Sequence, residues 1–88
     1  MKLIFTKAAM KDARKIKDKN QQQKIEAAIL EMKAAQSLSD ITNVKRLKGH
    51  PFAYRKRIGD YRLGFLLRDN ELVVSRILKR SDIYNVFP

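Results

Sequence analysis

The sequence predicts an α+β domain in which a helical hairpin packs on one face of an antiparallel sheet, in the order β-α-α-β-β-β. Two observations carry this prediction. Residues 7–36 place apolar side chains at helical spacing, whereas residues 53–79 form strand-like runs separated by turn signals. The chain has 88 residues, which is the length of a single domain, 1–88.

The first half of the chain is expected to supply one strand and two helices. The apolar run at 2–5 is long enough for a single strand. Thr6 has the character of an N-cap for a helix at about 7–17, and Asn20 is the next cap candidate. The second helix is expected to reach about residue 36. Its apolar side chains form one stripe at i, i+3, i+4 and i+7, namely Ile25, Ala28, Ile29 and Met32.

The second half is expected to supply the rest of the sheet. Residues 37–43 are loop-like, and residues 44–52 lead into the sheet with Gly49 and Pro51 as breaks. His50 is the only histidine, and one imidazole completes neither a metal site nor a catalytic triad. Three strands are then expected before a short terminal segment: 53–58, 61–68 and 71–79.

The pair Gly59-Asp60 predicts a two-residue hairpin of type II′. Residues that flank such a loop lie directly opposite each other, so Ile58 should pair with Tyr61 and Arg57 with Arg62. One face of the sheet should therefore pack on the helices, and it carries Tyr54, Ile58, Tyr61, Leu63, Phe65 and Leu67, with Lys56 as the polar exception. The other face carries Arg55, Arg57, Arg62 and Arg68.

The opposed arginines need a physical explanation, because like charges directly opposite on a sheet are destabilising. Either the guanidinium groups of Arg57 and Arg62 splay apart into solvent, or they form an anion site that grips phosphate oxygens. The chain has 20 Lys and Arg against nine Asp and Glu, a net charge of +11. Such a charge favours a polyanionic partner and therefore the anion site.

The orientation of the last strand depends on the loop before it. A two-residue loop at Asp69-Asn70 would turn Arg76 and Arg80 towards the helices. A three-residue loop through Glu71 would instead turn both arginines to the basic face and Ile77 inward. We expect the longer loop, because burying two unpaired arginines would cost several kcal/mol.

Residues 44–88 carry a recognisable pattern. It consists of Leu-Lys-Gly, then Tyr-Arg-x-Arg-x-Gly-Asp-Tyr-Arg, an apolar strand and a final basic pair before Asp-Ile-Tyr. This pattern resembles the second half of the RelE/ParE superfamily of bacterial type II toxins, and the expected element order of the whole chain resembles it too.

The resemblance to the RelE branch implies a cytoplasmic endoribonuclease that cuts mRNA, usually at the ribosome, without a metal or other cofactor. In the implied reaction, the ribose 2′-oxygen attacks the adjacent phosphate. The resemblance also implies that a cognate acidic antitoxin silences the toxin, and we expect the toxin to be monomeric within that complex. The residues that match the family's catalytic positions are Arg55, Arg57, Arg62, Arg80 and Tyr84. Further RNA contacts are assigned to Lys45, Arg46, Lys48, Lys56, Arg76 and Lys79.

The chain departs from the family pattern at one position. Many relatives carry His where this chain has Lys79, and lysine is a poor proton carrier unless it is strongly desolvated. Proton transfer would then fall to Tyr84, unless Tyr84 only packs in the terminal turn. Two other functions stay open, namely a ParE-like DNA gyrase poison without nuclease chemistry and a catalytically weak RNA-binding relative. The chain has no cysteine, and no apolar run in it is long enough to span a membrane.

Overall fold

The computed structural model describes residues 1–88 and confirms the α+β architecture. In chain order the elements are β1 (Lys2–Phe5), α1 (Lys7–Arg14), α2 (Lys19–Ala34), the short 3₁₀ helix η1 (Leu38–Asp40), β2 (Val44–Arg46), β3 (Ala53–Ile58), β4 (Tyr61–Arg68), β5 (Glu71–Lys79) and α3 (Arg80–Ile83). None of the helices combines the length and the hydropathy that crossing a bilayer requires.

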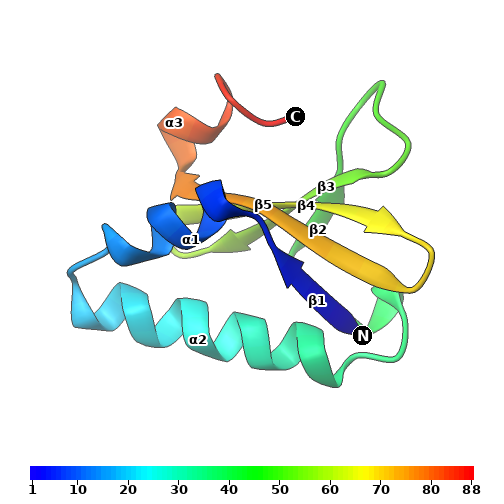
Figure 1. The fold of residues 1–88 in the computed structure, drawn as a ribbon, viewed down its shortest axis with the longest axis horizontal. Helices are drawn as coiled ribbons and strands as arrows, with labels where there is room; N and C mark the ends of the chain where they lie inside the picture. The colour runs from blue at the N-terminus through cyan, green and yellow to red at the C-terminus, as the bar shows by residue number, and fades with distance from the viewer.

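The strands form one sheet in the order β1-β5-β4-β3-β2. All neighbours are antiparallel except β1, which runs parallel to β5. In Figure 1, α2 runs along one side of the sheet, while α3 and the C-terminal tail lie on the other side. The parallel pairing of β1 with β5 and the short strand β2 were not predicted. A strand of three residues, such as β2, gives no periodic signal of its own.

Each face of the sheet has its own hydrophobic core. The larger core joins the helices to the sheet and includes Ile25 and Met32 of α2 together with Leu63, Phe65 and Ile77 of the strands. The smaller core lies under the C-terminal segment and consists of Leu47, Ala53, Ile83 and Phe87. The face opposite the helices is therefore only partly open to solvent.

The helix boundaries differ from those that the sequence predicted. Thr6 caps α1 as expected, and its hydroxyl accepts a hydrogen bond from the N–H of Ala9 at 3.1 Å. The cap of α2 is Asp18 rather than Asn20, and α1 ends at Arg14. The segment that links the helices is therefore longer than expected, and Ile16 within it is buried in the larger core.

The first hairpin has the predicted register. Ile58 pairs with Tyr61 and Arg57 pairs with Arg62 across the Gly59-Asp60 loop. Gly59 has a φ of +58°, and Asp60 has a negative φ, as a type II′ turn requires.

The second hairpin corrects the sequence interpretation. Arg68 pairs with Glu71, so the loop has two residues and not three. The pairing then skips Ser75, because Phe65 lies opposite Val74 and Gly64 lies opposite Arg76. This β-bulge reverses which side chains face the helices, so Ile77 is buried in the larger core although the loop is short.

Candidate active site

A cleft of about 490 Å³ opens where the C-terminal segment meets the sheet. It is lined by residues of β2, β3, β4, α3 and the loop before β2, namely Asn43, Val44, Lys45, Arg55, Arg57, Arg62, Arg80 and Tyr84. All five residues to which the resemblance assigned catalysis therefore lie around one cleft. Every charged side chain that lines it is cationic, so the cleft can attract an anion.

The opposed arginines are each held by a different acceptor. Nη1 of Arg62 donates to the carbonyl oxygens of Gly59 and Tyr61, both at 2.9 Å. Nη2 of Arg57 donates to Oδ1 of Asn43 at 3.4 Å. These bonds draw the two guanidinium groups towards separate oxygens, while both groups still line the same cleft.

The position of Arg62 suits it to bind a ligand. Its hydrogen bonds to the hairpin use only Nη1, which leaves Nε and Nη2 for another acceptor. A guanidinium group offers its N–H donors in a planar fork that matches the oxygens of a phosphate. The hairpin carbonyls therefore orient Arg62 without exhausting its donors.

Tyr84 projects into the cleft and does not pack in the core. It is 57% exposed, whereas its neighbours Ile83 and Phe87 are buried in the smaller core. Cζ of Arg55 lies 4.3 Å from the centroid of the Tyr84 ring, the geometry of a cation–π contact. The pKa of Tyr84 is lowered, first by hydrogen bonding with Arg80 and also by the positive charge of Arg55.

The smaller core places Tyr84 over the sheet. A Cβ atom at Gly64 of β4 would lie 2.5 Å from the Phe87 ring, so the tail packs directly on the β4 backbone at this point. Ile83 and Phe87 therefore fix the tail on both sides of Tyr84 in the sequence. Only glycine permits this close approach.

The structure places Lys56 away from the cleft, which corrects its assignment to RNA binding. Its side chain is 3% exposed, and Nζ lies 2.6 Å from Oε1 of Glu31 on the helix side of the sheet. The register itself predicted that Lys56 would face the helices. Its ammonium group is already paired there and cannot reach an RNA.

Arg76 also lies outside the cleft. Its Nε and Nη2 donate to the two carboxylate oxygens of Asp12 in α1, at 2.8 Å and 3.1 Å. Asp12 is buried and additionally accepts the N–H of Ile77 at 2.9 Å. Arg76 therefore holds α1 against β5, and the arginine is partly buried but paired.

The remaining basic residues differ in whether they line the cleft. Lys45 lines the cleft, and Lys79 lines a neighbouring hollow that shares Arg62 and Arg80 with it. Arg46 and Lys48 are exposed but do not line the cleft. Lys79 is thus near the arginines although it does not face Tyr84 across the main cleft.

Sequence reasoning missed Asn43, which supports Arg57 from the loop before β2. Its φ is +57°, a left-handed conformation that asparagine tolerates better than most residues. Its backbone oxygen accepts the N–H of Arg57 at 2.9 Å. The available signal was an asparagine that ends a loop just before a strand, which is too common to single out a site.

A mixed five-stranded sheet with α1 and α2 packed on one face is the fold of the RelE-like toxins. The chain belongs to the ParE toxin family of type II toxin-antitoxin systems, since the family model described as "ParE toxin of type II toxin-antitoxin system, parDE" matches residues 3–84.

Individual relatives agree with this assignment. The chain is 33% identical over 89 residues to Toxin RelE3 of Methanocaldococcus jannaschii, and the alignment covers 100% of both chains. A solved RelB-RelE antitoxin-toxin complex from Methanococcus jannaschii contains a chain with a TM-score of 0.80 and 29% identity, covering 97% of this chain and 99% of that one. The intact RelBE toxin-antitoxin complex of E. coli contains a chain with a TM-score of 0.69 and 22% identity, covering 89% of this chain and 94% of that one.

 At 22% identity, the likeness to the E. coli toxin bears on the fold alone.

Proposed function

We propose that this chain is a toxin that acts as an endoribonuclease, cutting mRNA at the ribosome with its own side chains. The observation that carries the proposal is the cleft in which Arg55, Arg57, Arg62 and Arg80 surround Tyr84. A polyanionic substrate suits this charge, and the phenol adds a group that can move a proton. The similarity to RelE toxins supports the same reading.

The proposed reaction is a transfer of the phosphate from one ribose oxygen to another. The 2′-oxygen attacks the adjacent phosphorus, the bond to the 5′-oxygen breaks, and one proton passes in net from the 2′-hydroxyl group to the leaving oxygen. Arg57 and Arg62 are suited to stabilise the additional negative charge on the phosphate oxygens in the transition state. The protein also aligns the attacking oxygen with the phosphorus, which by itself accelerates such a reaction.

Tyr84 is the residue that we assign to proton transfer. A general acid or base works best when its pKa lies near the pH of the reaction, and the pKa of Tyr84 is lowered by Arg80 and Arg55. Lys56 cannot share this role because it is buried in an ion pair on the other face.

We further propose that this chain is a monomeric toxin within a larger complex. An acidic antitoxin binds it there and neutralises its charge of +11. The solved relatives from Methanococcus jannaschii and E. coli are toxin-antitoxin complexes. An acidic segment that folds on binding could cover the cationic cleft. Expression without such a partner should arrest growth.

The experiment that tests the proposed function is an incubation of the purified chain with translating ribosomes, followed by primer extension on the mRNA. New 5′ ends at defined positions support the proposal. A parallel incubation with DNA gyrase and supercoiled DNA tests the alternative, which the ParE description of the family model favours. Trapped gyrase cleavage complexes with intact mRNA would replace the nuclease by a gyrase poison, and mRNA binding without cleavage would indicate a weak RNA-binding relative.

A further inference from the structure

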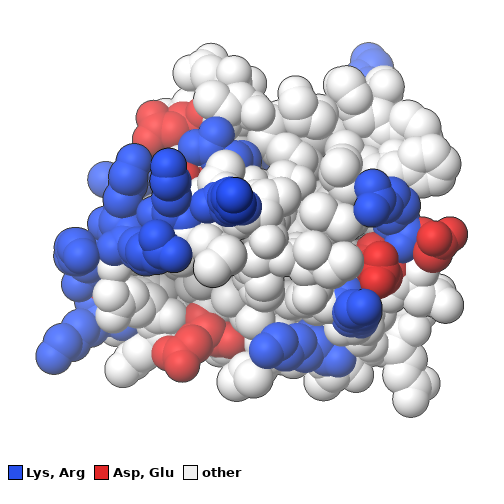
Figure 2. Space-filling model, viewed as in Figure 1, with Lys and Arg blue, Asp and Glu red and all other residues white.

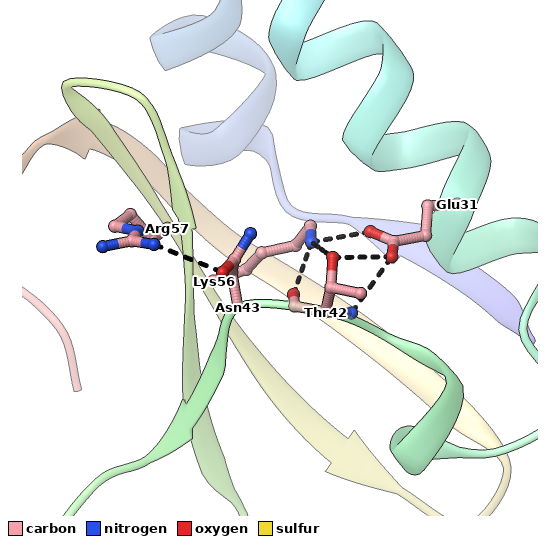
Figure 3. A network of polar contacts seen from close by, with 5 residues as sticks. All are labelled: Glu31, Thr42, Asn43, Lys56 and Arg57. Atoms are coloured by element: carbon pink, nitrogen blue, oxygen red, sulfur yellow. Dashed lines mark hydrogen bonds and ion pairs between the residues drawn. The ribbon is translucent and has the colours of Figure 1, made fainter.

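Lys56 lies between two cleft arginines in the sequence, but its side chain enters the opposite face of the sheet. Its Nζ atom lies 2.6 Å from Oε1 of Glu31 and 2.6 Å from the carbonyl oxygen of Thr42. Figure 3 shows these contacts between α2, the loop before β2 and β3. A buried ammonium group needs such partners, because breaking a buried ion pair is strongly destabilising.

Glu31 connects the same loop to α2. Its Oε2 atom accepts hydrogen bonds from the N–H of Thr42 at 3.0 Å and from the hydroxyl group of Thr42 at 2.8 Å. Lys56 donates to the carbonyl oxygen of Thr42. All three hydrogen-bonding groups of Thr42 are therefore engaged, two by Glu31 and one by Lys56. Thr42 is exposed, so polar contacts rather than burial hold it in place.

Asn43 follows Thr42 and contacts Arg57 twice. The backbone oxygen of Asn43 accepts the N–H of Arg57 at 2.9 Å, and its Oδ1 accepts from Nη2 of Arg57 at 3.4 Å. The left-handed φ of +57° at Asn43 is a sparsely populated conformation that persists only where its surroundings determine it. A displacement of Thr42 would therefore reach Arg57 across one peptide bond.

We infer that Glu31, Thr42 and Lys56 form a positioning network that sets, through Asn43, the direction of the Arg57 guanidinium group in the cleft. The inference rests on the proposed function, in which Arg57 stabilises the scissile phosphate. The three residues do not touch the RNA, and they act only through Arg57. The cleavage rate depends on the position of the Arg57 guanidinium group, since a displacement of 1 Å can slow a reaction by about 10²-fold.

The positioning role can be separated from stability. Well-packed apolar residues of similar volume often replace a buried ion pair without a loss of stability. The network variant is therefore Glu31→Leu/Lys56→Met, which removes both charges together. The control is Lys2→Met/Glu71→Leu, which removes the same two charge types from the pair at 3.4 Å between β1 and β5. Glu31→Gln is the milder network variant if the double variant does not fold.

The first test measures single-turnover cleavage of ribosome-bound mRNA. The network variant should cleave about 10- to 100-fold more slowly than the wild type, and the control should match the wild type. In an Arg57→Ala background, the network substitutions should cause no further loss. A wild-type rate in the network variant, or the same loss with and without Arg57, would overturn the inference.

The second test does not require RNA cleavage. Sulfate should raise the melting temperature of the wild type, because a ligand stabilises the state that it binds. The network variant should lose as much of this rise as Arg57→Ala does. A wild type that responds to sulfate but cuts no RNA would contradict the proposed nuclease alone. A network variant with a wild-type sulfate response would contradict the positioning network alone.

Discussion

The pairing of Arg57 with Arg62 shows how far single residues could be predicted. Hairpin geometry gave the register and therefore the like-charge pair, which the structure contains. It could not give the hydrogen bond from Arg57 to Asn43, because Asn43 belongs to the loop before β2 and not to the hairpin. Tyr84 illustrates the same limit, since the sequence left its packing open, whereas in the structure it is 57% exposed and lines the cleft.

Tyr84→Phe tests the proton-transfer role at the residue scale. Because the side chain is exposed, the melting temperature should stay nearly unchanged, while cleavage should fall by about 10²- to 10⁴-fold, the contribution of one acid–base group. Tyr61→Phe removes a hydroxyl group outside the cleft and serves as the control, with cleavage at the wild-type rate. If Tyr84→Phe cleaves as fast as the wild type, another group moves the proton.

Arg62→Ala tests the cost of the opposed charges. The substitution removes a like-charge pair, but it also removes two hydrogen bonds to the hairpin carbonyls. These effects have similar size and opposite sign, so the free energy of unfolding should change by no more than about 1 kcal/mol. Urea unfolding measures this change, and thermal melts with sulfate should show a smaller stabilisation than in the wild type. A loss of several kcal/mol together with an unchanged sulfate response would make Arg62 a structural residue.

At the scale of elements, the β-bulge at Ser75 determines which side chains at the end of β5 face the helices and which face the cleft. The sequence predicted that Arg80 would reach the basic face, and Arg80 lines the cleft, but the expected longer loop was wrong. A bulge cannot be read from the pattern of β5, because apolar residues occur there in both registers. The ion pair of Arg76 could not be predicted either. Its partner Asp12 lies in α1, and the residue pattern of β5 carries no information about α1.

Gly64→Ala tests how β4 supports the C-terminal segment. The new methyl group would meet the Phe87 ring, so the tail must shift, at a cost of about 1–3 kcal/mol for overpacking. Tyr84 lies on the same segment, so cleavage should fall as well. Adding Phe87→Leu to Gly64→Ala makes room and should recover part of both losses. Wild-type stability in Gly64→Ala would contradict the tight packing between β4 and the tail.

The contacts that Glu31 of α2 makes with Lys56 and Thr42 predict a pH dependence of the free energy of unfolding. The pKa of Glu31 is lowered, first by the hydrogen bond from Lys56 and then by its bonds with Thr42, against the opposing effect of burial. The stabilisation is therefore fully present above the unfolded-state pKa of about 4.3 and is lost as the pH falls through the lower folded-state value. Urea unfolding between neutral and acidic pH should show this loss in the wild type and a shallower decline in Glu31→Gln. Parallel curves would show that Glu31 does not titrate differently in the folded state.

At the scale of the whole molecule, positive charge is not confined to the cleft. Figure 2 shows Lys and Arg gathered over α1 and the beginning of α2. The exposed basic residues of this region include Lys7, Lys11, Arg14, Lys15 and Lys19. The net charge of +11 correctly indicated a basic surface, but composition alone could not divide it into a cleft, a helix surface and two internal ion pairs.

We propose that this chain cuts mRNA at its basic cleft. The most direct test of this proposal is primer extension on a defined transcript after induction of the wild type or Arg62→Ala in growing cells, at equal amounts of folded protein. We expect new 5′ ends with the wild type and almost none with Arg62→Ala, because an arginine that stabilises a phosphate in the transition state contributes several kcal/mol. Identical 5′ ends with both proteins, or intact mRNA in cells that the wild type has arrested, would contradict the proposal.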